Sequence, residues 1–108
     1  MARKRAPDHL GLETQRWWLK VTREFELDDH HLKLLTLAGE AWDRCQEARE
    51  RIAQDGAYLP DRFGQLRAHP AIAVERDSKI AFCRLLRELD LDVSVSEPKR
   101  PPMLRRYA

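Results

Sequence analysis

The segment Asp28-Asp29-His30-His31 gathers four side chains of the types that bind metal ions, since carboxylates and imidazoles are common zinc ligands. Neighbouring residues on a helix point about 100° apart, so the two imidazoles cannot easily share one tetrahedral ion. An aspartate at this position can instead cap a helix, and its charge suits the positive end of the helix dipole. We interpret the segment as a polar helix start and predict no metal site.

Residue types used in catalysis are present, but not in the spacings that catalysis requires. Asp90 and Asp92 end a helical pattern, where nothing else converges to complete a catalytic carboxylate pair. The sequence has no glycine-rich phosphate-binding loop, and no nucleophile, base and orienting residue can be named together. Cys45 and Cys83 lie far apart without CxxC spacing, as expected of reduced thiols in a cytosolic protein. We predict a protein that is not an enzyme and has no cofactor.

Positive charge is concentrated at the two ends of the 108-residue chain, whose net charge is only +2. Residues 1–9 have a balance of +2 and residues 97–108 one of +3, which leaves residues 10–96 at −3. Basic ends of this kind suit nucleic acid, whose phosphates attract lysine and arginine. The C-terminal group can alternatively dock on a protein partner or form a solubilising tail. The candidate DNA-binding residues of the two ends are Arg3, Lys4, Arg5, Lys99, Arg100, Arg105 and Arg106.

A third basic group consists of Arg16, Lys20 and Arg23, spaced i, i+4 and i+7 in a helix expected at residues 13–25. This spacing places the three cations on one side of the helix. They are candidates for contact with DNA phosphates, and the alternative is a solvated helix face. A helix-turn-helix is not favoured, because the next expected helix is far longer than a usual recognition helix.

The hydrophobic periodicity predicts a mainly α fold of three helices, at about residues 13–25, 29–54 and 70–89. Asp55-Gly56 is a stop signal for the second helix, and Pro70 suits the first turn of the third. Between them, turn residues at 60–64 separate two short apolar flanks, which predicts a β-hairpin at about residues 57–67. Such a hairpin is marginal alone in water, so it must pack on helices or pair with a neighbouring subunit.

The second helix carries a seam of small and apolar residues that suits either an antiparallel helix pair or an oligomer contact. Two adjacent tryptophans in the first helix cannot point in one direction, so one of them is expected to face a second surface. The tryptophans are interpreted as core or subunit contacts, since a platform for stacking bases needs basic neighbours. The candidate oligomer-interface residues are Trp17, Trp18, Ala38, Ala41, Trp42 and Cys45.

The expected organisation is one helical oligomerisation domain at residues 12–92 between two flexible basic segments. These segments are an N-terminal arm at residues 1–11 and a tail at residues 93–108 that is rich in proline and arginine. No stretch approaches the roughly 20 apolar residues of a membrane span, and no apolar region follows the basic start as in a signal peptide.

Six segments of the sequence follow this order of elements: Arg16-Trp17-Trp18, Leu35–Arg44, Asp61-Arg62-Phe63-Gly64, His69-Pro70-Ala71, Glu75-Arg76-Asp77 and Phe82–Leu89. These segments and their order resemble one branch of the phage terminase small subunits, small helical proteins with a β-hairpin before the last helix. The resemblance covers roughly residues 10–92. Two positions depart from the family pattern: His69 stands where asparagine is common, and Asp90 where glycine is common. Aspartate suits a left-handed helix end less well than glycine, which leaves the exit path of the tail open.

The resemblance implies a function in viral genome packaging. Such a protein forms a homo-oligomeric ring in the host cytoplasm, binds or positions double-stranded phage DNA, and regulates the large terminase subunit. The ATPase and nuclease belong to that large subunit. The alternative is a helical interaction or regulatory module that binds a partner protein and no DNA.

Overall fold

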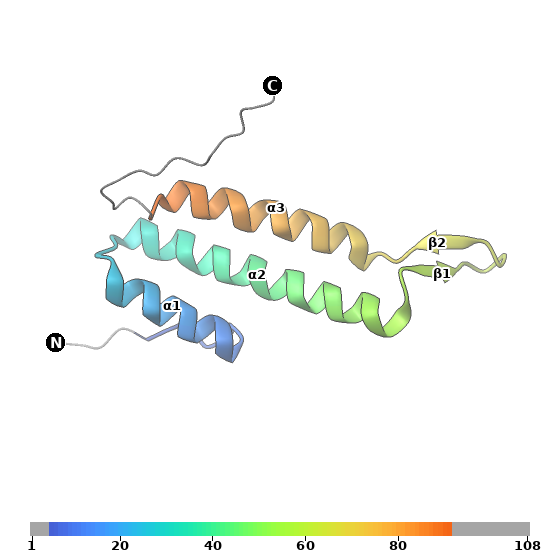
Figure 1. Cartoon of the computed structure of the whole chain (residues 1–108), viewed down its shortest axis with the longest axis horizontal. Helices are drawn as coiled ribbons and strands as arrows, with labels where there is room; N and C mark the ends of the chain where they lie inside the picture. The colour runs from blue at the N-terminus through green and yellow to red at the C-terminus, as the bar shows by residue number, and fades with distance from the viewer. Residues whose placement is uncertain (1–4, 92–108) are drawn as a thin grey trace, which may run out of the picture.

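The computed structural model describes residues 5–91, and it confirms a mainly helical chain with a two-stranded hairpin before the last helix. Helix α1 spans Leu12–Glu24, α2 spans Asp29–Asp55 and α3 spans Ala71–Leu89. The predicted ranges agree with these bounds to within a residue at each end. In Figure 1, α2 lies between α1 and α3, and α3 runs antiparallel to α2. No helix in this part of the chain is long and apolar enough to cross a membrane.

The small residues of α2 pack within the chain. Ala38, Cys45 and Ala48 are buried along one side of α2, and Ser78 is buried on α3. The contact between α2 and α3 is the most extensive one between elements. Small side chains let two helices approach closely along their length, so the seam serves the antiparallel helix pair, one of the two predicted uses.

The hydrophobic core lies where α1 meets the beginning of α2 and the end of α3. Its buried members come from all three helices and from the segment before α1. The indole Nε1 of Trp18 donates a hydrogen bond of 3.2 Å to Thr36 Oγ1, so the polar atom of this buried ring is satisfied. The buried residues of this core are Leu10, Trp18, Val21, Leu35 and Leu89.

The predicted boundary of the flexible N-terminal arm is wrong. Leu10 is only 3% exposed, and its side chain lies against Gly39 of α2, where a methyl group would meet Leu10 Cδ1 at 3.2 Å. Asp43 of α2 holds the beginning of α1, because its carboxylate accepts bonds from the Gly11 N–H (2.8 Å) and the Thr14 hydroxyl. Residues 5–11 therefore belong to the folded domain, and the predicted tail at 93–108 lies outside the described residues.

The β-hairpin pairs β1 (Tyr58–Pro60) with β2 (Leu66–Ala68) in antiparallel register. Asp61 organises the turn, since its Oδ1 accepts hydrogen bonds from the N–H groups of Phe63 and Gln65. Those backbone bonds, that of Gln65 above all, and the Arg67 guanidinium hold the pKa of Asp61 below its ordinary value. The hairpin extends past the ends of α2 and α3 (Figure 1) and rests on neither helix along its length.

His69 and Asp90 lie at the two ends of α3. His69 is buried and accepts the Ala71 N–H on its Nδ1 at 2.9 Å, so it caps the first turn as an asparagine would. Asp90 ends the helix in the left-handed conformation, with φ 50° and ψ 49°. Its N–H bonds the Leu86 carbonyl at 3.0 Å, which settles the path of the chain as far as Leu91.

Candidate functional site

Two of the predicted DNA-binding residues lie around one hollow. Arg5, from the segment before α1, and Arg23, from the last turn of α1, both line a cavity of about 700 Å³. Its α1 wall is formed by Gln15, Leu19 and Thr22, which recur at helical spacing along one side of the helix. The structure thus brings together cations that are 18 positions apart in the sequence. Asp8 is the acidic residue of the lining.

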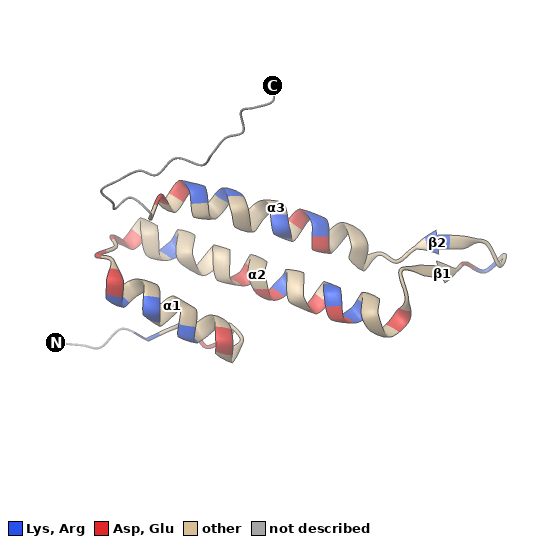
Figure 2. Cartoon of the chain, in the orientation of Figure 1, with Lys and Arg blue, Asp and Glu red and all other residues tan. Residues whose placement is uncertain are grey.

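The remaining cations of α1, Arg16 and Lys20, are exposed on the same helix. Figure 2 shows the basic positions of α1 on the side of the molecule opposite α3. None of the ion pairs within residues 5–91 uses Arg5, Arg16, Lys20 or Arg23. We call these four residues the α1 basic surface.

Five of the ten cations of α2, the hairpin and α3 are neutralised by carboxylates, whereas the other five are in no ion pair within residues 5–91: Lys33, Arg44, Arg62, Arg84 and Arg87. Arg49 pairs with Glu75 at 3.0 Å, and Arg51 pairs with Asp55 at 3.2 Å. Lys79 approaches Glu75 at 3.8 Å. Arg67 and Arg76 likewise each have an aspartate partner. A phosphate would compete with these carboxylates, whereas on the α1 basic surface it would meet uncommitted donors.

The other predicted DNA-binding residues cannot be placed. Arg3, Lys4, Lys99, Arg100, Arg105 and Arg106 lie outside the described residues.

The burial of the six candidate oligomer-interface residues reduces the number that can contact a second copy. Trp18, Ala38 and Cys45 are each at most 5% exposed and pack inside their own chain, so they offer no surface to a second copy. Trp17 and Ala41 are half-buried, and Trp42 is 40% exposed. Trp18 is buried in the core and Trp17 packs against the same core while staying partly exposed, so the expectation that one of the two faces a second surface stays a prediction. Self-association through Trp17, Ala41 and Trp42 stays a prediction.

The hairpin carries an apolar face that sequence reasoning did not single out. Its register pairs Tyr58 with Ala68 and Pro60 with Leu66, so these four side chains share one face of the two strands. Tyr58 is 64% exposed and Leu66 is 69% exposed. Nothing within residues 5–91 covers this hairpin face. The signal was available, since every second residue of both flanks is apolar.

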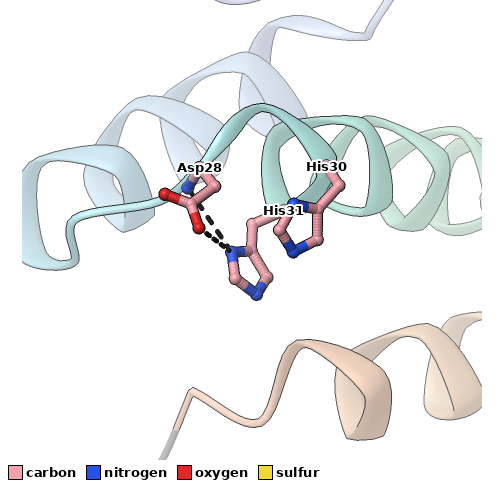
Figure 3. Close-up of side chains that lie close together, drawn as sticks. All are labelled: Asp28, His30 and His31. Carbon is pink, nitrogen blue, oxygen red and sulfur yellow. Dashed lines mark hydrogen bonds and ion pairs between the residues drawn. The ribbon is translucent and has the colours of Figure 1, made fainter.

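The group at the start of α2 lies closer together than helix geometry suggested. Potential ligand atoms of Asp28, His30 and His31 all lie within 4.8 Å of one another, and the two imidazole rings are 4.2 Å apart (Figure 3). The Asp28 N–H donates a weak 3.4 Å bond to His31 Nδ1, so that nitrogen already serves the helix start. The positive end of the helix dipole also disfavours a cation here. The predicted polar helix start accounts for the cluster.

Comparison of the chain with protein-family models, curated proteins and solved structures finds no match.

Proposed function

We propose that this chain is a terminase small subunit, a non-enzymatic ring-forming protein that binds or positions double-stranded phage DNA for packaging. The observation that carries this proposal is the α1 basic surface, whose four cations have no acidic partner within residues 5–91 while five of the ten cations of α2, the hairpin and α3 are paired. Lysine and arginine side chains that contact phosphates displace the counterions condensed on DNA, and this release dominates non-specific DNA affinity.

Self-association is the second part of the proposal. The apolar hairpin face of Tyr58, Pro60, Leu66 and Ala68 supports it, because a two-stranded hairpin with an exposed apolar face gains stability from a covering partner. A repeating head-to-tail contact closes into a ring when its rotation allows. In a ring, the four cations of every subunit would lie near the same DNA, and their charges would add up to a strong positive electrostatic potential.

The large terminase subunit is the proposed protein partner, and the host cytoplasm is the proposed location. In this scheme the small subunit supplies position and charge, and the large subunit supplies ATP hydrolysis and DNA cleavage. The basic residues outside 5–91 extend the proposed DNA contact from both ends of the chain.

Native mass spectrometry of the full chain, with and without a short duplex DNA, tests the proposal in one measurement. The expected result is a closed oligomer of one defined size that retains the duplex at low salt and loses it as salt rises. A monomer at micromolar concentration, or an oligomer indifferent to DNA at low salt, contradicts the proposal.

The second candidate is a helical interaction module without DNA binding. The exposed aromatic residue Trp42, which lies beside Phe82 with ring centroids 5.2 Å apart, favours a protein partner at the centre of the molecule. This candidate predicts a monomer or dimer with no affinity for the duplex in the same experiment.

A further inference from the structure

A small aromatic hollow lies where all three helices meet, apart from the α1 basic surface. It measures about 250 Å³ and is lined by Glu13, Thr14 and Trp17 of α1, Trp42 of α2 and Phe82 of α3. The centroid of the Phe82 ring lies 5.2 Å from that of Trp42 and 6.0 Å from that of Trp17. The rings are tilted by 51° and 49°. Three tilted rings from three helices thus form the walls of one concave site.

The lining has the chemistry of a cation site. Aromatic faces carry partial negative charge and attract ammonium and guanidinium groups, most strongly at tryptophan. Glu13 stands one helical turn before Trp17 and adds a full negative charge, and no ion pair within residues 5–91 occupies its carboxylate. The hydroxyl of Thr14 is already donated to Asp43. No cationic side chain lines the hollow, so Glu13 has no side-chain counter-charge there, and only the positive end of the α1 dipole offsets part of its charge.

We propose that this hollow binds an arginine side chain presented by a partner protein. Its volume lies below the roughly 300–1,000 Å³ typical of sites for drug-sized ligands, and suits one side chain. A guanidinium is planar, weakly hydrated and able to stack on an indole while it donates two bonds to a carboxylate. Lysine has neither the planar stacking surface nor the paired donors.

The carboxylate of Glu13 argues against the other occupants. An apolar side chain in the hollow would leave the charge of Glu13, which is exposed at its edge, without a partner. A nucleotide base would stack equally well on the rings. Its phosphates, however, would be repelled by the Glu13 carboxylate, whereas sites that stack bases normally have basic residues beside the rings. The proposal is independent of the proposed DNA binding, because no residue of the hollow belongs to the α1 basic surface.

Three tryptophans make an NMR titration informative. The full chain, labelled with ¹⁵N, is titrated with N-acetyl-arginine amide, and the indole N–H signals are followed. Trp17 and Trp42 are expected to shift together and saturably at millimolar concentration, while Trp18, hydrogen-bonded to Thr36 in the core, stays unchanged as an internal reference. N-acetyl-citrulline amide, which has the same shape without the charge, and N-acetyl-leucine amide are expected to bind at least about five-fold more weakly.

Variants of the carboxylate decide the outcome. Glu13→Gln is expected to weaken arginine binding about five-fold, because it removes the charge and keeps the shape. Glu24→Gln, exposed at the other end of α1, serves as the matched control and is expected to change nothing. A leucine probe that binds as well as arginine, an unchanged affinity in Glu13→Gln, or no saturable shift of Trp17 and Trp42 overturns the proposal. The indole signals of Trp17 and Trp42 can also shift when the protein itself is diluted. If this dilution shift disappears in Glu13→Gln, it supports the proposal and identifies the partner as a second copy.

Discussion

The imidazole Nε2 of His69 lies 2.9 Å from Asp55 Oδ2, so a residue two positions before α3 is bonded to the last residue of α2 across the base of the hairpin. The other ring nitrogen, Nδ1, accepts the N–H of Ala71, which leaves the Nε2–H to donate to the aspartate. His69 is buried, whereas Arg51 reaches the same Asp55 oxygen from the surface at 3.2 Å. One carboxylate thus joins the exit of α2, the entry of α3 and the two ends of the hairpin.

Acid is expected to loosen this junction. The hydrogen bond from His69, and after it that from Arg51, holds the pKa of Asp55 below its ordinary value. A carboxylate with a lowered folded-state pKa stabilises the protein above its unfolded-state pKa of about 4, and this contribution is lost as pH falls through the folded-state pKa. The difference in unfolding free energy between the wild type and Asp55→Asn should shrink between pH 5 and pH 2. Urea denaturation measures it, and a difference that stays constant with pH contradicts the assignment.

The left-handed conformation of Asp90 predicts a stabilising substitution. A non-glycine residue with φ near 50° is held in a region that costs roughly 1–2 kcal/mol, and glycine avoids most of this cost. Asp90→Gly should raise the free energy of unfolding by about 1 kcal/mol, measured by thermal or chemical denaturation. Asp90→Ala is the control. Alanine shortens the side chain without gaining conformational freedom, so a gain with alanine equal to that with glycine would rule out backbone strain.

Asp43 is expected to stabilise the attachment of α1 to α2. Its carboxylate accepts bonds from the Gly11 N–H and the Thr14 hydroxyl at a helix start that has no cap of its own. Asp43→Ala should lower the free energy of unfolding by about 1–2 kcal/mol, the usual loss when a charged acceptor or cap is removed. A double-mutant cycle with Thr14→Val should show coupling, because the two side chains share one bond. Additive effects would mean that this bond contributes nothing.

The sequence predicted the helices and the hairpin because each is encoded locally. Period 3.6 marks α2, and Asp61 with Gly64 marks the turn. The burial of Leu10 was not predicted, because a single apolar residue between charged and turn-forming residues has no periodicity. Its importance comes from Gly39, 29 positions later in the chain, which leaves room for its side chain. Tertiary contacts of this kind are not visible within a local window.

The two candidate surfaces could be predicted to different extents. Arg16, Lys20 and Arg23 follow from helical spacing, but the contribution of Arg5 depends on how residues 5–11 fold back along α1. The aromatic hollow requires the relative rotation of three helices. The periodicity of a single helix specifies its buried face and not which ring of another helix stands opposite. The contacts of Phe82 with Trp17 and Trp42 therefore follow only from the folded chain.

The α1 basic surface is expected to carry a measurable share of DNA affinity. Replacing its four cations together, in Arg5→Gln, Arg16→Gln, Lys20→Gln and Arg23→Gln, should weaken duplex binding and reduce the salt slope. The reduction should be about 0.9 per lost phosphate contact. Fluorescence anisotropy at several salt concentrations measures both quantities.

A matched control separates this surface from net charge. The control variant combines Arg49→Gln, Arg51→Gln, Arg76→Gln and Lys79→Gln. It also removes three arginines and one lysine, but these four side chains are already paired with carboxylates. Exposed ion pairs contribute little to stability, so this variant should fold normally. Equal loss of affinity in both variants would attribute DNA binding to overall charge and not to the α1 basic surface.

The apolar hairpin face is expected to be covered in the assembled protein. Leu66 and Tyr58 expose more than half of their side chains in the single chain, and fully burying a large apolar side chain contributes roughly 1.5–3 kcal/mol. Leu66→Ser should therefore weaken self-association at least about ten-fold, as measured by sedimentation velocity, while helix content by circular dichroism stays the same. Leu12→Ser is the matched control, because Leu12 is equally exposed, at 71%, but lies on α1. If Leu66→Ser assembles like the wild type while Leu12→Ser does not, the contact between copies lies along α1, and the hairpin is not what joins them.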